Sequence, residues 1–147
     1  MKQILFITLI CLAFSYDNWG AVNYARTYCA NYNGWYNNYR PPNGGGDCAN
    51  FVSQCLLRGG ADLSRCYGTD SKGAIPYVPN LKSCLTQLGW KSSRSRPAEF
   101  YAGYPMFLED YHAMICTEIS GDTVYYCAHT EDVCNRQLYG SPIYYYL

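Results

Sequence analysis

The sequence predicts an α+β fold in one domain, with helices in the first half of the chain and a small antiparallel sheet in the last third. Three observations lead to it. Apolar residues recur at helical spacing in the first half, and β-branched and aromatic runs separated by turn residues fill the last third. No linker, repeat or charge run divides the 147 residues, so we expect a single domain.

The chain begins with a pattern typical of a secretory signal peptide. Met1–Gln3 lead into an unbroken apolar run, Ile4–Phe14, and Ala13 and Ser15 are small enough to flank a signal-peptidase site. The run is eleven residues long, whereas about 20 are needed to span a bilayer. We therefore expect a signal at residues 1–15, a mature domain at residues 16–147, a secreted or lumenal location and no membrane association after cleavage.

Composition excludes one class of partner. The formal net charge is zero and charged residues make up 15% of the chain, against about 25% in ordinary soluble proteins. No basic surface is available to hold nucleic acid or anionic lipid.

The first predicted helix begins after Asp17 or Asn18, either of which can cap it, and ends at Asn33-Gly34. Three of its tyrosines recur every four residues, and we expect them to pack rather than to form a binding site: Tyr24, Tyr28 and Tyr32.

A second, buried helix follows a turn-rich stretch at residues 34–46. Asp47 is its predicted cap, and Gly59-Gly60 end it. Its inward side is marked by apolar residues at helical spacing: Cys48, Phe51, Val52, Cys55 and Leu56. A third, shorter helix opens at Pro79 or Asn80 and closes at Gly89.

The strands come last. Residues 112–119 and 123–129 flank a Ser-Gly-Asp turn and predict a hairpin. Residues 143–146 are a further strand candidate, and residues 103–108 another.

A two-residue turn at Gly121-Asp122 fixes the register expected for this hairpin. It places His129 opposite Met114 and diagonal to His112, so that both histidines share one face of the sheet. The same register makes Cys116 and Cys127 cross-strand neighbours, a candidate disulfide.

The cysteines allow two interpretations. Removal of the signal takes Cys11 with it and leaves eight, which invites four disulfides in an oxidising compartment. If Cys48 is free, the other seven cannot all pair, and Cys55 is then the expected spare thiol.

Cys48 is also the candidate nucleophile. It sits at a helix N-terminus, where free N–H groups and the helix dipole favour a thiolate. His112 is the expected base and His129 the residue that orients it. A structural disulfide is the alternative for Cys48. Histidines and cysteines in and just after the hairpin could also form a zinc site: His112, Cys116, Cys127, His129 and Cys134. Paired C-x-x-C spacing is missing, however, and we expect neither metal nor cofactor.

Three segments together resemble the putative amidase domain within the papain-like NlpC/P60 and CHAP superfamily: AVNYARTYCANYN (21–33), GGGDCANFVSQCLLRGG (44–60) and HAMICTEISGDTVYYCAHTEDVCNR (112–136). The resemblance implies a papain-like fold and a cysteine hydrolase of amide bonds, either amidase or endopeptidase, often acting on bacterial peptidoglycan. It implies Cys48 as nucleophile, His112 as general base and acid, and His129 as orienter. Asp47 and Asn50 match the motif, and we expect them to brace the helix.

The sequence departs from that family in lacking a Gly-Asp turn before the histidine strand and in its many cysteines. A non-catalytic descendant is therefore the second hypothesis: a disulfide-stapled secreted domain that binds saccharide or protein, or assembles with itself, through some of its 17 tyrosines. A disulfide at Cys48 would favour that hypothesis.

Overall fold

The computed structural model describes residues 15–147. The predicted signal peptide lies outside the described residues except for Ser15. The described part contains the helices α1 (Asn18–Tyr28), α2 (Cys48–Arg58) and α3 (Val78–Gln87), followed by the strands of one antiparallel sheet. The α+β prediction is therefore confirmed, as is the order of helices first and strands later. No helix of residues 15–147 is long and apolar enough to cross a membrane.

The sheet has six strands in the order β1-β6-β2-β3-β4-β5. Their bounds are Lys91–Ser93 (β1), Pro105–Leu108 (β2), His112–Ser120 (β3), Thr123–Ala128 (β4), Val133–Gln137 (β5) and Ile143–Tyr146 (β6). The sequence predicts the four inner strands but neither edge strand. The edge strands β1 and β5 are short and mostly exposed, so they carry no hydrophobic alternation by which they could be found.

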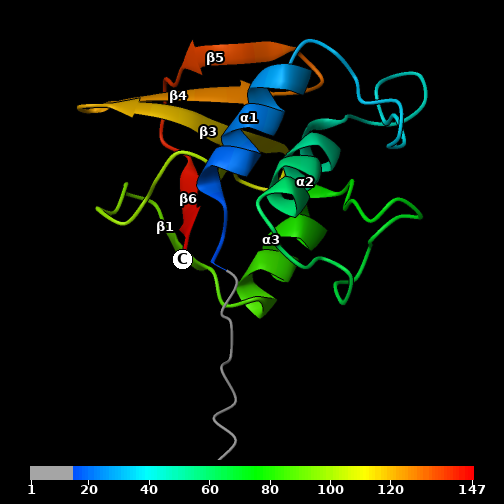
Figure 1. The fold of residues 1–147 in the computed structure, drawn as a ribbon, viewed down its shortest axis with the longest axis horizontal. Coiled ribbons are helices and arrows are strands. Elements are labelled where there is room, and N and C mark those ends of the chain that lie inside the picture. The colour runs from blue at the N-terminus through cyan, green and yellow to red at the C-terminus, as the bar shows by residue number, and fades with distance from the viewer. Residues whose placement is uncertain (1–14) are drawn as a thin grey trace, which may run out of the picture.

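Helices α1 and α2 lie against the sheet, with α1 crossing in front of β3 and β4 and α2 beside it (Figure 1). α3 packs beside α2, away from the hairpin of β3 and β4. The core between the layers is apolar and includes fully buried side chains from both: Phe51 and Leu56 of α2, Phe107 of β2, and Ile115 of β3. α2 is almost completely buried from Cys48 to Leu56, as its amphipathic pattern predicts.

α1 ends earlier than expected, at Tyr28 rather than at Asn33. Cys29, the next residue, is bonded to Cys134 of β5, with 5.3 Å between the two Cα atoms. Tyr32 has left the helix, and its ring stacks on His129 instead. The four-residue spacing of the tyrosines thus continues into a segment that is not helical.

Two disulfides are present among the described residues, Cys29–Cys134 and Cys66–Cys84. Four cysteines of residues 15–147 are free and buried: Cys48, Cys55, Cys116 and Cys127. The expectation of a spare thiol at Cys55 is confirmed, whereas the alternative of four bridges is wrong. Disulfides are typical of oxidising compartments, and these two are compatible with an extracellular protein.

The predicted register of the hairpin holds only near its turn. Ser120 pairs with Thr123 as expected, but a bulge between Cys116 and Glu118 shifts the pairing by one residue, so that Cys116 lies opposite Tyr126. Because neighbouring residues point to opposite faces of a sheet, Cys116 and Cys127 face away from one another. The predicted disulfide between them is therefore wrong.

Candidate active site

The candidate nucleophile, Cys48, is the first residue of α2. A glycine-rich turn delivers the chain to it, and one glycine there is sterically required. A Cβ on Gly44 would lie 2.7 Å from the carbonyl oxygen of Tyr39, which is closer than non-bonded atoms approach. Because Gly44 has no side chain, the turn can fold back against Tyr39 before it reaches Cys48.

Two opposing effects act on the Cys48 thiol. Burial raises its pKa, and the neighbouring carboxylate of Asp47 adds to the rise. The N–H groups of Ala113, Ala49 and Cys48 itself act in the other direction, as expected at a helix N-terminus. Burial is the larger effect, so the thiol is protonated at neutral pH. The sequence predicts the N–H groups but not the burial that outweighs them.

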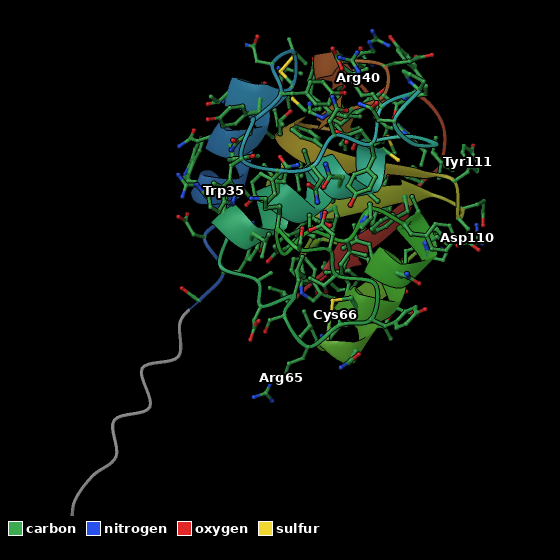
Figure 2. All side chains as sticks on the ribbon, turned by 90° about the vertical axis from the view of Figure 1, so that its right-hand side faces the viewer. Trp35, Arg40, Arg65, Cys66, Asp110 and Tyr111 are labelled. Carbon is green, nitrogen blue, oxygen red and sulfur yellow. A yellow bond between two sulfur atoms is a disulfide. The ribbon has the colours of Figure 1, made fainter. Side chains whose placement is uncertain are left out.

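Cys48 opens into a cavity of about 360 Å³. The walls come from three separate segments of the chain: Tyr39, Gly45 and Gly46; Pro76, Tyr77 and Val78; Asp110 and Tyr111. Asp110 and Tyr111 project from one edge of the molecule in Figure 2. The side chain of Tyr111 is 71% exposed, so the cavity is open to solvent on that side.

His112 is the first residue of β3 and lines a second cavity of about 310 Å³. Tyr111 belongs to the walls of both cavities, so the two adjoin. Burial lowers the pKa of His112, and the charge of Glu131, which lines the same cavity, partly offsets this. The imidazole is therefore neutral at pH 7.

The candidate nucleophile and base line adjoining cavities but are not hydrogen bonded to one another. The backbone of Ala113, the residue after His112, is one of the groups that lower the pKa of the Cys48 thiol. In the part of the chain that the structure describes, no side-chain hydrogen bond joins Cys48 to His112 or to His129. The structure therefore holds a neutral thiol and a neutral imidazole on adjoining walls of one open surface, rather than a preformed ion pair.

Asp47 is fully buried. It occupies the N-cap position of α2, but its side chain makes no cap hydrogen bond, so the prediction of a side-chain cap is wrong. The carboxylate instead accepts from Tyr39 N at 2.9 Å and from Asn50 Nδ2 at 2.9 Å, and it lies 2.8 Å from His129 Nδ1. It joins the glycine-rich turn, the first turn of α2 and the end of β4.

Asn50 is also fully buried and braces the same turn. Its Nδ2 donates to the carbonyl oxygen of Asn37 at 2.8 Å as well as to Asp47. Its Oδ1 is a buried acceptor without a hydrogen-bond partner. Since both partners of Nδ2 can only accept, the orientation of the amide is fixed by them.

His129 does not contact His112. The shifted register, continued past Ile115, places it on the face of Ala113, opposite to that of His112. Both ring nitrogens are occupied, Nδ1 by Asp47 at 2.8 Å and Nε2 by the carbonyl oxygen of Tyr28 at 2.6 Å. The expectation that His129 orients the His112 imidazole depended on the unshifted register and is wrong.

The partners of the His129 ring show which nitrogen must carry a hydrogen. The Tyr28 carbonyl can only accept, so Nε2 carries a hydrogen. Nδ1 lies 2.8 Å from the Asp47 carboxylate. Phe51 and Tyr32 stack on the two faces of the ring, with centroids 3.8 Å and 4.2 Å away. His129 is thus enclosed by one carboxylate, one carbonyl and two aromatic rings.

Two residues that the sequence analysis missed also lie here. Thr130 Oγ1 accepts the backbone N–H of Asp47 at 2.8 Å, and Glu131 faces His112 across its cavity. Both follow His129 directly, but a threonine and a glutamate in a turn give no signal of their own. The acceptor of His129, the carbonyl of Tyr28, is a backbone atom and is invisible in any sequence pattern.

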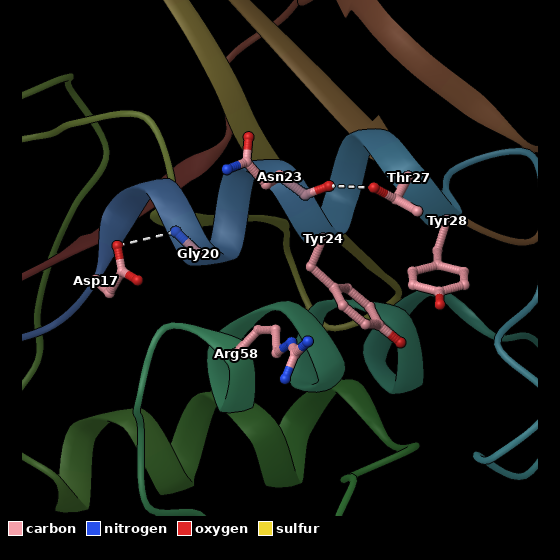
Figure 3. Close-up of a pocket in the computed structure, with 7 residues that line it drawn as sticks. All are labelled: Asp17, Gly20, Asn23, Tyr24, Thr27, Tyr28 and Arg58. Carbon is pink, nitrogen blue, oxygen red and sulfur yellow. Dashed lines mark hydrogen bonds between the residues drawn. The ribbon is translucent and has the colours of Figure 1, made fainter.

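A further cavity, of about 480 Å³, lies between α1 and the C-terminal end of α2 (Figure 3). Polar side chains line most of it, including Asp17, Asn23, Thr27 and Arg58. Two of its hydrogen bonds are internal to α1 and its cap, Asp17 with Gly20 and Thr27 with Asn23. It contains neither a cysteine nor a histidine, and it belongs to the helix pair rather than to the candidate site.

A metal centre finds no support in the geometry. Cys134, one of the residues considered for zinc, is bonded to Cys29. In residues 15–147, no three His, Cys, Asp or Glu side chains are grouped as metal ligands.

The fold defines a small α+β domain of three helices and a six-stranded antiparallel sheet over the described residues. The chain belongs to the family described as the putative amidase domain, whose model matches residues 15–107. The match suggests hydrolase activity. It runs from α1 to β2 and includes Asp47, Cys48 and Asn50, but it ends before His112 and His129. Comparison with curated proteins and comparison with solved structures each gave no match.

Proposed function

We propose that this protein is a cysteine-dependent amide hydrolase in which Cys48 is the nucleophile and His112 the general base and acid. One observation carries the proposal. In a chain of the putative amidase family, a free cysteine at a helix N-terminus lines an open cavity that adjoins the cavity of a histidine. A free Cys48 also argues against the non-catalytic alternative, which a disulfide at this position would have favoured.

The directions of the two pKa shifts define the first step. Since the thiol and the imidazole are both neutral at rest, the proton leaves Cys48 during attack rather than before it. As the sulfur attacks the amide carbonyl carbon, His112 takes the thiol proton, a C–S bond forms, and the carbonyl oxygen becomes an oxyanion. The N–H groups at the start of α2, of Cys48 and Ala49, are the donors available to stabilise that oxyanion.

Breakdown follows the general acid–base pattern. The imidazolium of His112 donates its proton to the amide nitrogen, the C–N bond breaks, and the amine leaves. His112 then removes a proton from water, which attacks the thioester and releases a carboxylic acid and the free Cys48 thiol. The cycle balances without a cofactor.

Glu131, and not His129, supplies the polar group beside the base. Its carboxylate faces His112 in the same cavity and favours the protonated imidazole that forms during the reaction. Asp47 and His129 act one step further from the chemistry, because they hold the N-terminus of α2 against β4 and contact neither His112 nor the cavity of Cys48.

For the substrate, we propose the amide bonds of bacterial peptidoglycan, reached by secretion through a signal at residues 1–15. An open surface with Tyr39, Tyr77 and Tyr111 around Cys48 suits a polymer of sugar and peptide better than a small enclosed amide. The family resemblance of the sequence supports the same substrate class. Whether the bond joins sugar to peptide or two amino acids is the choice between amidase and endopeptidase.

The test compares two cysteine variants of one helix. Cys48→Ala is expected to abolish the release of amines from purified peptidoglycan, whereas Cys55→Ala, one heptad further along α2 and also free and buried, keeps the turnover number of the folded protein. Alkylation of the unreduced protein at alkaline pH, read by mass spectrometry, is expected to label Cys48 before Cys55, Cys116 and Cys127, because Cys48 lines an open cavity. Undiminished hydrolysis by Cys48→Ala would overturn the proposal.

A further inference from the structure

The residue after His129 has an unusual backbone. Thr130 has a φ of 83°, in the left-handed region that a β-branched residue rarely occupies. Such a conformation costs about 1–3 kcal/mol and persists only where surrounding contacts impose it. The contacts made by Thr130 therefore indicate what the conformation is for.

Thr130 holds a backbone group that the helix leaves free. The N–H of Asp47 precedes the first turn of α2 and has no partner within the helix, and Thr130 Oγ1 accepts it at 2.8 Å. The same Oγ1 packs closely on the turn before Cys48, since a Cβ on Gly46 would lie 3.3 Å from it. The hydroxyl thus fits against the two residues that lead into the candidate nucleophile.

His129 and Thr130 together hold Asp47 from two sides. His129 Nδ1 lies 2.8 Å from the carboxylate, and Thr130 Oγ1 binds the backbone N–H. Two consecutive residues of an extended strand point to opposite faces, so they could not both reach one residue. The left-handed conformation at Thr130 turns the chain so that both side chains meet Asp47.

Thr130 also lies beside the candidate base. It lines the cavity of His112 together with Glu131. One turn of the chain therefore contacts the N-terminus of α2 on one side and the surroundings of His112 on the other.

We propose that Thr130 is a positioning residue, whose hydroxyl fixes the start of α2 and so sets the place of the Cys48 sulfur relative to His112. The inference rests on the proposed function, because it concerns the geometry between nucleophile and base. The left-handed conformation of Thr130 directs its hydroxyl toward Asp47, whereas an unstrained turn would direct it away.

The experiment separates the effect of the Thr130 hydroxyl from the effect of its strained backbone. Thr130→Ser keeps the hydroxyl, Thr130→Val replaces it by a methyl group of similar size, and Thr130→Gly removes it while adopting the positive φ without strain. Thr69→Val is the matched control, because Thr69 is also half-buried in a loop and its hydroxyl binds backbone carbonyl oxygens away from the site.

Two readouts are taken for each variant: kcat and KM with peptidoglycan, and the pH dependence of iodoacetamide labelling at Cys48. Thr130→Val and Thr130→Gly are expected to lose about 10–100-fold in kcat with KM unchanged, and to label Cys48 with a profile displaced to higher pH. Thr130→Ser and Thr69→Val are expected to match the wild type in both. Should Thr130→Val fail to fold, Thr130→Gly supplies the same comparison.

A wild-type kcat and labelling profile in Thr130→Gly would overturn the inference. The labelling profile does not depend on turnover, so it distinguishes this failure from that of the proposed function. If Cys48→Ala still hydrolyses peptidoglycan while the Thr130 variants displace the labelling profile, Thr130 positions Cys48 and the proposed reaction is wrong.

Discussion

Replacing Asp47 by asparagine and by alanine should have very different effects on stability, although both remove the charge. Asparagine is nearly isosteric, and every hydrogen bond can be rebuilt. Its Oδ1 would accept from Tyr39 N and Asn50 Nδ2, as the carboxylate does, and its Nδ2 would donate to Nδ1 of a neutral His129 whose Nε2–H still binds Tyr28. Asp47→Asn is therefore expected to cost only about 1 kcal/mol, the difference between a charged and a neutral hydrogen bond.

Alanine offers no such replacement. It leaves the Tyr39 N–H and the ring of His129 without their partner in a site where Asp47 and His129 are 0% and 1% exposed. An unsatisfied buried donor costs about 1–3 kcal/mol, and breaking a buried pair by removing one member costs about 3–5 kcal/mol. We expect Asp47→Ala to lower the free energy of unfolding by about 3–5 kcal/mol.

The measurement is urea unfolding at neutral pH, followed by near-ultraviolet circular dichroism. Glu99→Ala is the control, since this residue is exposed in a loop and its loss should leave the free energy of unfolding nearly unchanged. Equal losses for Asp47→Asn and Asp47→Ala would refute the reasoning, because they would mean that charge, and not the satisfied hydrogen bonds, stabilises the pair.

Two further predictions concern pH and the disulfides. Because burial holds the pKa of His112 below 6.5, kcat/KM should rise with pH and level off below pH 6.5. Glu131→Gln removes the charge that raises this pKa, so the rise in kcat/KM should move to still lower pH. A move to higher pH would contradict the assignment of His112 as the base. Cys29→Ala opens a loop with a sequence separation of 105 and Cys66→Ala one of 18, so chain entropy predicts that the first loses about 1.5 kcal/mol more stability. Thermal unfolding of both variants checks this, and a larger loss for Cys66→Ala would contradict it.

The helical half of the fold could be predicted because its signals are local. Apolar residues from Cys48 to Leu56 share one helical face and Gly59 follows them, and α2 begins and ends as this pattern indicates. The early end of α1 could not be predicted in the same way. It coincides with the bond between Cys29 and a cysteine in β5, a partner that no local pattern identifies.

The sheet shows the same division. The turn at Gly121 fixes the pairing of Ser120 with Thr123, and this part of the register is confirmed. The bulge at Thr117 adds one unpaired residue to β3. Two hydrogen bonds from distant segments meet there: the Thr117 hydroxyl bonds to Asn135, and the Thr117 carbonyl oxygen accepts from Arg26. One such residue reverses the face of every side chain beyond it.

That reversal explains what the sequence could and could not say about the site. The residue types at Cys48 and His112 could be found from their chemistry and spacing, and they stay candidates. The partner of His129 could not be found in this way, since it depends on which face of the sheet the His129 side chain points to. With the bulge, His129 meets Asp47, a residue 82 positions earlier that a cap motif had seemed to explain.

The bond between Cys29 and Cys134 constrains how the protein is made. It cannot close until Cys134 has been synthesised, whereas Cys66 and Cys84 are only 18 positions apart and can meet much earlier. Cys29 directly follows Tyr28, whose carbonyl binds His129. During biosynthesis, the end of α1 is thus tethered later than the segment from Cys66 to Cys84, and the acceptor for His129 becomes fixed only after Cys134 has been translated.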